Sequence, residues 1–212
     1  MDRDESEERS IHRFEAFSDI VIGFSLAQLG ASLALPSRPI ELFTNLIWLV
    51  AFLWAFAMVC SMWWFHHRFF TQLFVPRTAP VLLNFLWLAV VVLCVYTAQI
   101  SSRHISDNVV WRMYFVLFAL AYGLLALQYR IGLRIRDDLT PEQRVSAQRA
   151  GAFMHLWTVP FVICAIVVFV FPFGSVSGLA IDASFIGTTI ASTLMARRFR
   201  RQQAAFERDS TA

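Results

Sequence analysis

The sequence predicts an all-α integral membrane protein with six transmembrane helices. Of its 212 residues, 58% are hydrophobic and only 16% are charged. Soluble domains contain roughly 45–50% apolar and about 25% charged residues, so this composition is typical of a membrane protein. Apolar runs of about 20 residues recur along the chain, and a helix of that length crosses the hydrocarbon core of a bilayer. Helices are expected because each segment must satisfy its own backbone hydrogen bonds inside the membrane.

Six apolar segments of this kind follow one another, separated by short connections. They cover residues 14–35, 42–65, 81–100, 109–129, 150–171 and 178–195. The connections leave no room for a soluble domain, so we expect one membrane domain over residues 13–198. Residues 1–12 form a polar lead-in that lacks the basic start and cleavage site of a secretory signal. Residues 199–212 form a tail.

The placement of the arginines predicts the orientation of the chain. All 18 basic residues are arginines, and 15 of them lie on the side that holds both termini. Arg38, Arg103 and Arg112 are the remaining three. The positive-inside rule therefore places the lead-in and the tail in the cytoplasm. A basic cluster directly after the last segment is more typical of an anchor against anionic lipid than of a nucleic-acid site, so membrane lipid is the expected partner and nucleic acid is not.

The sequence gives little support to an enzyme or to a bound cofactor. The three cysteines, Cys60, Cys94 and Cys164, lie inside apolar segments and are expected to be small core residues. His66 and His67 are adjacent, so they point about 100° apart on a helix and cannot share a metal ion. No nucleophile with its base and no glycine-rich phosphate loop is evident. We therefore expect no catalytic residues and no cofactor.

Polar side chains at membrane depth are the first functional candidates. Arg13, Ser18 and Asp19 stand at the start of the first segment, and placing one such charge in the bilayer core costs roughly 3 kcal/mol on insertion scales. Arg13 and Asp19 are too far apart in sequence to pair along one helix, so we expect both to bond to other helices. The alternative is that both side chains simply reach the headgroups. The candidate partners at the same depth are Trp63, His66, His67 and Asn84.

One face of the first segment carries an unusual series of side chains. Phe17, Phe24, Gln28, Ala31 and Leu35 recur at helical spacing. If this face lined a pore, it would present aromatic rings, then an amide, then small and apolar groups, and hydrophobic constrictions are one known way to gate a channel. The alternative is an ordinary packing face on which Gln28 bonds to a neighbouring helix. The residues by themselves leave both interpretations open.

Three short motifs resemble a known family. The stretch from Arg13 to Asp19, RFEAFSD, resembles the R-x-x-x-F-S-D signature that opens the first span of the transmembrane protein 175 family. The stretch from Trp63 to Phe70, WWFHHRFF, is similar to the W-x-x-H-H-x-x-F that ends the second span. Asn84 matches an asparagine early in the third span. The three motifs occur in the order expected for the family.

The resemblance implies a potassium-permeable channel of a prokaryotic inner membrane, built as a homotetramer around a central pore. The first helix of each subunit would line that pore, without a carbonyl filter of the T-V-G-Y-G type. The positions of the family's aliphatic constriction correspond to Phe24, Gln28 and Ala31, and Leu35 continues the same face. Potassium or other monovalent cations are the implied partners, besides further copies of the chain, and no other metal ion is expected.

The resemblance also implies a polar network that holds the pore helix in place. This network corresponds to Arg13, Phe17, Ser18, Asp19, Trp63, His66, His67 and Asn84. Because phenylalanine, glutamine and alanine replace the aliphatic constriction, the resemblance does not fix the ion selectivity. Two other functions stay open. One is a proton-coupled carrier or proton pathway that titrates Asp19 and the histidines, and the other is a non-conducting scaffold that acts through the arginines from Arg130 onward.

Overall fold

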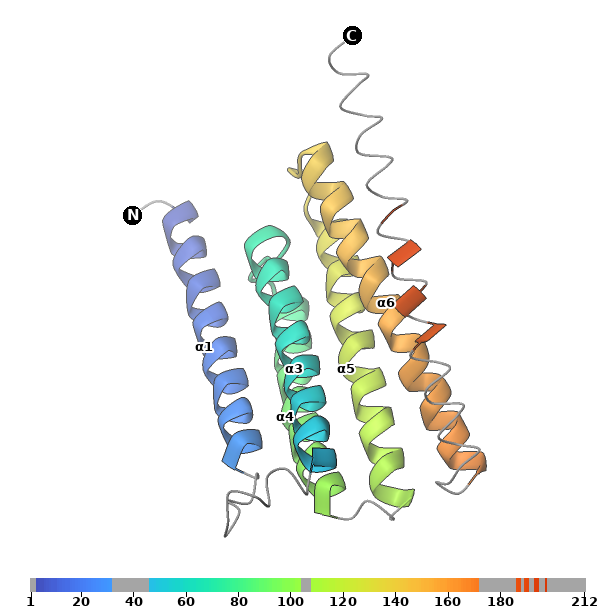
Figure 1. Cartoon of the computed structure of the whole chain (residues 1–212). Coiled ribbons are helices and arrows are strands. Elements are labelled where there is room, and N and C mark those ends of the chain that lie inside the picture. Colours follow the sequence, from blue (N-terminus) through green and yellow to red (C-terminus); the bar gives the residue numbers. More distant parts are fainter. Residues whose placement is uncertain are drawn as a thin grey trace.

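The computed structural model describes residues 3–31, 46–103 and 108–171, together with a few helical positions between residues 186 and 197. Its helices are α1 (Arg3–Ala31), α3 (Leu46–Gln72), α4 (Thr78–Arg103), α5 (Asn108–Ile135) and α6 (Pro141–Val170). Figure 1 shows them side by side in one bundle, with α1 at one edge. Leu35 and most of the predicted segment 178–195 lie outside the described residues.

The helices have the length and composition of membrane spans. Four of the stretches described are long and apolar enough to cross a bilayer: Glu5–Ala31, Thr78–Ser101, Asn108–Ile135 and Pro141–Val170. The region predicted as the second segment forms α3, which packs against α1, α4, α5 and α6. The predicted class, an all-α membrane protein that crosses the bilayer more than once, is confirmed.

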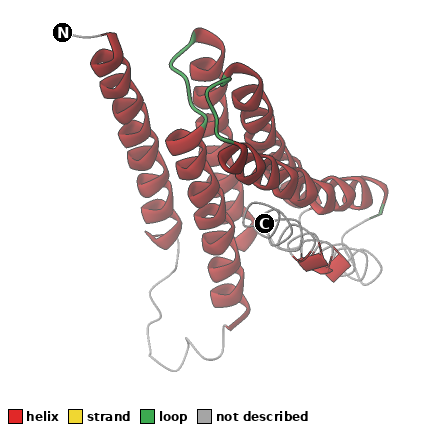
Figure 2. Ribbon diagram, turned by 90° about the horizontal axis from the view of Figure 1, so that it is seen from above, coloured by secondary structure: helices red, strands yellow, loops and turns green. Residues whose placement is uncertain are grey.

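Two helix connections and the start of α1 lie at the same end of the bundle. Residues 73–77 join α3 to α4, and residues 136–140 join α5 to α6; both connections are drawn as loops in Figure 2. Arg77, Arg134 and Arg144 lie in or beside these connections. These three arginines, which are among those that predict the orientation, therefore lie at the same end as the start of α1, and we call it the arginine-rich end.

Helix α6 begins nine residues before the apolar segment predicted there, because polar residues start it. Thr140 and Gln143 form a reciprocal capping box: the Gln143 N–H donates to Thr140 Oγ1 over 3.2 Å, and the Thr140 N–H donates to Gln143 Oε1 over 3.0 Å. Pro141 occupies the first turn, where a missing N–H costs nothing. Just before this cap, the bond from the Arg136 guanidinium lowers the pKa of Asp138 below its usual value.

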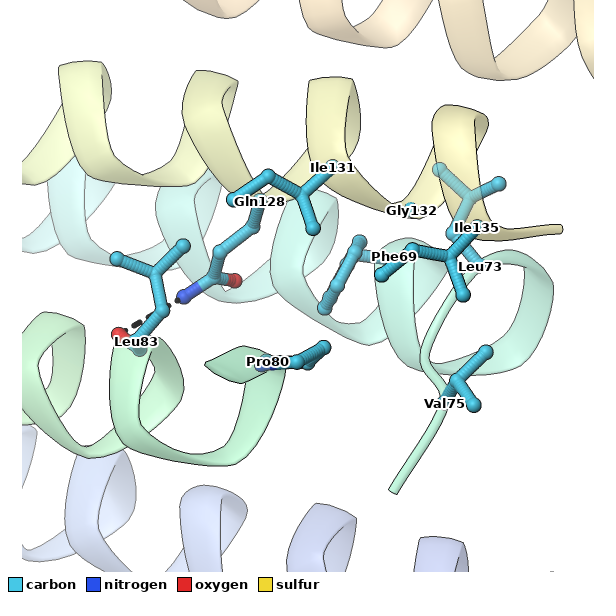
Figure 3. A pocket seen from close by; sticks show the side chains of 9 residues that line it. All are labelled: Phe69, Leu73, Val75, Pro80, Leu83, Gln128, Ile131, Gly132 and Ile135. Atoms are coloured by element: carbon cyan, nitrogen blue, oxygen red, sulfur yellow. Dashed lines mark hydrogen bonds between the residues drawn. The ribbon is translucent and has the colours of Figure 1, made fainter. Parts of the chain in front are cut away.

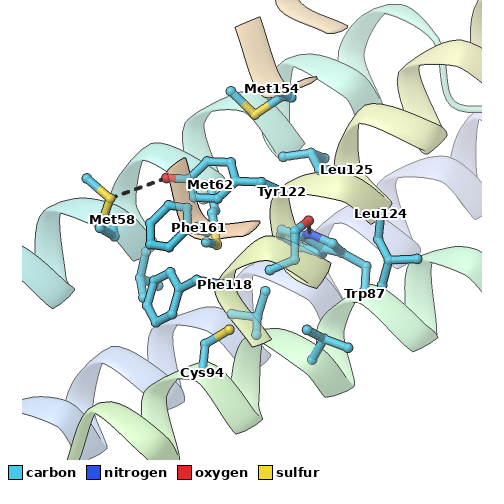
Figure 4. Close-up of a cluster of buried hydrophobic side chains, with 14 of the residues drawn as sticks. Met58, Met62, Trp87, Cys94, Phe118, Tyr122, Leu124, Leu125, Met154 and Phe161 are labelled. Atoms are coloured by element: carbon cyan, nitrogen blue, oxygen red, sulfur yellow. Dashed lines mark hydrogen bonds between the residues drawn. The ribbon is translucent and has the colours of Figure 1, made fainter. Parts of the chain in front are cut away.

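A core rich in aromatic rings holds α3, α4, α5 and α6 together. Trp87, Phe118, Tyr122 and Phe161 are almost completely buried there, with methionine and Cys94 between them (Figure 4). The polar tips of the large rings find partners on neighbouring helices, as a low-dielectric interior requires. The Trp87 indole N–H donates to the Ala121 carbonyl over 3.0 Å, for example. Cys60, Cys94 and Cys164 are free thiols.

Helix α5 approaches the end of α3 closely at Gly132. A Cβ atom at this position would lie 2.8 Å from Leu73 Cβ, which is well inside normal contact distance. Beside it, among α3, α4 and α5, is a hollow of about 10 Å³ lined by Phe69, Leu73 and Gln128 (Figure 3). The Gln128 side chain donates to the Leu83 carbonyl over 3.3 Å. The hollow has the size of about one water molecule, so it is too small for a transported solute.

Candidate functional site: the two faces of helix α1

Helix α1 has one face buried in the bundle and one face that points away from it. Ser18, Ile22, Ser25 and Leu29 follow one another at spacings of three or four residues, and all are buried. Within the described part of the chain, α1 packs against α3 and α4 and not against α5 or α6. The buried stripe is therefore the face that attaches α1 to its own bundle.

The opposite face of α1 carries the side chains predicted to line a pore. Phe24 is 71% exposed and Phe17 is 47% exposed, and Gln28 and Ala31 are exposed as well. Phe17 touches the bundle only at its margin, where its ring meets Phe85 of α4 edge-on with 5.9 Å between the centroids. The outward face thus presents aromatic rings, then an amide, then a small side chain, as the sequence predicts. No helix among the described residues covers it.

A chain of hydrogen bonds joins α3 and α4 to the buried face of α1. His66 Nε2 of α3 lies 2.7 Å from Asn84 Oδ1 of α4. The Asn84 amide donates to Ser18 Oγ over 3.2 Å, and the Ser18 hydroxyl donates to the Phe14 carbonyl over 2.8 Å. His66, Asn84 and Ser18 are each 0% exposed. The chain runs in one direction and ends on the backbone of α1.

The direction of this chain sets the form of the His66 ring. Because the Asn84 NH2 group donates to Ser18, its oxygen faces His66 and accepts, so His66 Nε2 carries the proton. The ring stacks on Trp87 with 4.2 Å between centroids and 6° between planes, and it also contacts Phe70. His66 Nδ1 is buried without a partner among the described residues. A second proton there would bury a charge against aromatic rings, so the arrangement fits a neutral histidine.

A second group of contacts holds α1 against α3 at a similar depth. The Trp63 indole N–H donates to Asp19 Oδ1 over 2.8 Å. The Trp63 ring stacks on His67 with 5.9 Å between centroids, and His67 Nδ1 lies 2.8 Å from Glu15 Oε1. His12 Nδ1 approaches the other oxygen of Glu15 at 3.8 Å. Asp19 therefore bonds across to another helix and does not simply reach the headgroups.

Glu15 is the member of this group that sequence reasoning missed. Its side chain is only 15% exposed although it carries a carboxylate, and it lies one helical turn before Asp19. That spacing, together with the histidines at the end of the second segment, was the available signal. It was overlooked because Glu15 occupies an unspecified position of the RFEAFSD signature.

Arg13 does not join either group of contacts. Its side chain is exposed, and it makes no hydrogen bond or ion pair with another described residue. The reason is its position on the helix, since Arg13 precedes Phe17 by four residues and so lies on the outward face. The structure brings Ser18, Asp19, Trp63, His66, His67 and Asn84 together around the buried face of α1, and it leaves Arg13 and most of Phe17 on the other side.

The described residues contain no cluster of three or more histidine, cysteine, aspartate or glutamate side chains able to hold a metal ion. The contacts of α1 with α3 and α4 are neutral and charged hydrogen bonds, and they hold α1 in place against these two helices.

Comparison with known proteins relates the helices that carry these contacts to a known family. Residues 13–94 match the family described as the endosomal/lysosomal potassium channel TMEM175. The match begins at Arg13 and extends past Asn84, so it includes every side chain of the two contact groups except His12. Over residues 13–94 the chain matches the TMEM175 family. This family is one of potassium channels and not of enzymes, which confirms the prediction that the protein is not an enzyme.

Two solved TMEM175 structures share the fold. One is a lysosomal potassium-selective channel TMEM175 homologue from Chamaesiphon minutus, with a TM-score of 0.61 and 20% sequence identity over 90% of this chain and 98% of that chain. The other is a variant of the potassium channel MtTMEM175, from Marivirga, in complex with a nanobody-MBP fusion protein. It gives a TM-score of 0.59 and 18% identity over 94% of this chain and 93% of that chain. No curated protein matches the chain.

Proposed function

We propose that this protein is a potassium-permeable channel of the TMEM175 family in a prokaryotic inner membrane, assembled as a homotetramer in which α1 of each subunit lines a central pore. The observation that carries the proposal is the outward face of α1. Phe24, the more exposed of its two aromatic rings, is 71% exposed, and one turn further the amide of Gln28 is exposed too. A polar amide in contact with lipid is unfavourable, so this face is expected to meet other copies of α1 and water.

The remainder of the architecture follows from the same proposal. The segment predicted at residues 178–195, which lies mostly outside the described residues, would be the sixth span, and the arginine-rich end would then face the cytoplasm with both termini. The two solved relatives that share the fold are both described as potassium channels. An even number of spans would bring both termini to the same side of the membrane, and the positive-inside rule makes that side the one richest in arginine.

Within the pore, the outward side chains would act in series. A ring of Phe24 side chains forms a hydrophobic constriction, which excludes water unless the helices move apart. One turn deeper, Gln28 offers amide oxygens that can replace part of the hydration shell of a cation. Ala31 leaves the passage wide below them, and Leu35 continues the face beyond the described residues. Passage in this scheme needs no carbonyl filter.

The hydrogen-bonded contacts on the other side of α1 have a structural role in this proposal. Asp19 bonds to Trp63, and Ser18 bonds to Asn84, on the face of α1 that points away from Phe24 and Gln28. These side chains hold the pore helix and do not touch the ion. Asp19→Ala is therefore expected to reduce assembly or expression more than it changes the ratio of potassium to sodium permeability.

Cation flux into liposomes tests the pore face. Gln28→Leu restores an aliphatic side chain and is expected to change the potassium flux or the potassium-to-sodium ratio. The matched control is Tyr96→Phe, which also removes one polar group from an exposed position, but on α4. If Gln28→Leu behaves like the control, Gln28 does not face the pore.

The same assay separates the other two functions. A saturable flux that depends steeply on pH between about 5 and 8 would indicate a proton-coupled carrier. Reconstituted protein that passes no monovalent cation at any voltage or pH would indicate a non-conducting scaffold.

A further inference from the structure

The seam between α5 and α6 carries polar and charged side chains that the proposed channel does not use. The two helices are antiparallel and keep one register along their length. A Cβ on Gly151 would lie 3.2 Å from Tyr129 Cβ, and a Cβ on Gly123 would lie 3.7 Å from Thr158 Cγ2. In the same register, Arg144 donates to the Arg136 carbonyl over 3.3 Å. These contacts fix which residues of α5 and α6 lie level with one another (Figure 1).

Helix α3 covers only one side of this seam. On that side, Phe65 stacks on Phe153 with 5.1 Å between centroids, and Arg68 donates to Ser146 over 2.8 Å. The opposite side of the seam is the one marked by Gly123 and Thr158. It is free of α3, and we call it the outer side.

Four polar side chains at the arginine-rich end share the outer side. Arg130 follows Gly123 by seven residues and so lies on the same edge of α5, and Arg134 follows one turn later. On α6, Gln148 and His155 lie seven residues apart, and His155 is three residues before Thr158. By the register of the helices, Gln148 lies at the level between Arg130 and Arg134, and His155 lies about two turns further into the membrane than Gln148. All four side chains are exposed.

The charge of this outer side is unbalanced. Neither Arg130 nor Arg134 has a carboxylate within ion-pair distance among the described residues, and the ion pair nearest to them in sequence joins Arg136 to Asp138. The nearby Asp138 is already bound to Arg136 through both carboxylate oxygens. Asp137 is exposed beyond the end of α5. The two guanidinium groups therefore stand one helical turn apart without a counter-ion from the part of the chain that the structure describes.

Exposed aliphatic side chains lie beside these polar groups and continue the edge more deeply. Leu127 of α5 is 40% exposed and lies between the levels of Gln148 and His155, and Val159 of α6 is 49% exposed and lies one turn deeper than His155. An edge that begins with paired arginines and ends in an exposed aliphatic side chain matches a phospholipid in polarity from headgroup to acyl chain.

We propose that the outer side of the α5–α6 seam is a binding site for an anionic glycerophospholipid of the leaflet at the arginine-rich end. Arg130 and Arg134 bind the phosphate, since guanidinium groups match phosphate oxygens in a two-bond geometry. Gln148 and His155 supply further hydrogen bonds to the headgroup and the glycerol esters. The acyl chains lie along Leu127 and Val159. The site is separate from the outward face of α1, so it does not depend on whether α1 lines a pore.

The experiment measures retained lipid by native mass spectrometry on the full-length protein, titrated with phosphatidylglycerol or phosphatidylcholine. Each arginine near an anionic surface is worth about fivefold in affinity, so the double variant R130Q/R134Q is expected to bind phosphatidylglycerol roughly thirtyfold more weakly than the unchanged protein. The control R9Q/R77Q also removes two exposed arginines and is expected to change binding less than about threefold, a margin below one full arginine contribution. Thermal unfolding of both variants checks that they fold.

A second variant, Q148L/H155L, keeps every arginine and is expected to weaken phosphatidylglycerol binding several-fold. The proposal is wrong if R130Q/R134Q binds phosphatidylglycerol as the control does, or if phosphatidylcholine binds as tightly as phosphatidylglycerol. It is also wrong if inorganic phosphate at millimolar concentration displaces the lipid, because the arginines would then form a site for a soluble anion.

Discussion

Replacement of Asn84 by leucine tests the hydrogen-bond chain that attaches α1 to the bundle. The change leaves the His66 Nε2 proton without an acceptor at a position that is 0% exposed. An orphaned buried donor costs about 1–3 kcal/mol, but bonds between membrane helices average about 0.6 kcal/mol and reach about 1.7 kcal/mol. We therefore expect Asn84→Leu to lower the free energy of unfolding by about 1–2 kcal/mol.

The bond itself is isolated by a double-mutant cycle with His66→Phe. Phenylalanine keeps a ring against Trp87, where His66 stacks at 4.2 Å, but it removes the donor. Each single change strands one buried partner, whereas the double change removes both, so the double variant should lose less than the sum of the two single losses. The expected difference is about 1 kcal/mol.

Unfolding in mixed detergent micelles provides the measurement for the four proteins of the cycle. The control cycle combines Asn84→Leu with Tyr122→Phe, because Tyr122 bonds to Ser61 and shares no hydrogen bond with Asn84. Its two changes should add within about 0.5 kcal/mol. If the His66–Asn84 cycle is as additive as the control, the two side chains do not stabilise each other, and the account of how α1 is held is refuted.

Two further predictions concern packing and charge. Gly132→Ala puts a Cβ 2.8 Å from Leu73 Cβ and should lower the free energy of unfolding by about 1–3 kcal/mol through overpacking. The control, Gly23→Ala, meets nothing within 4 Å and should leave the melting temperature unchanged or raise it. Equal melting temperatures for the two variants would contradict the close approach of α5 and α3. Glu15→Gln removes the carboxylate 2.8 Å from His67 and should lower the melting temperature, because the contact between α1 and α3 loses its charged member. A melting temperature equal to that of the unchanged protein would show that this contact does not hold α1.

Part of the candidate site could be predicted from the sequence, because short motifs fix which residues lie at the same depth. Asp19 and Asn84 lie near the starts of their segments and Trp63 near the end of its own, so the sequence places all three towards the same side of the membrane and predicts them as partners. The sequence could not say which pairs form. The structure pairs Trp63 with Asp19 and places Asn84 between His66 and Ser18, since those pairs depend on how α1 is rotated against α3 and α4.

The rotation of α1 also explains why the sequence does not predict the positions of Arg13 and Glu15. Arg13 was grouped with the polar network by its place in the signature, but it lies on the outward face with Phe24. Glu15 was not considered, yet the same rotation turns it towards His67. Position in a motif gives depth in the membrane, and the face that a side chain occupies is settled only when the helix packs.

The sequence by itself determined that this is an all-α membrane protein, because apolar runs of bilayer length have no other way to satisfy their backbone groups. It also determined the two series of side chains on α1, since a helical period separates them without any tertiary contact. Only the tertiary structure decided which series is buried: Ser18, Ile22 and Leu29 pack against α3 and α4, and Phe24 and Gln28 are left outside. The physical reason is that burial depends on partners from distant parts of the chain, here Trp63 and Asn84, and their directions are not encoded in the spacing of α1.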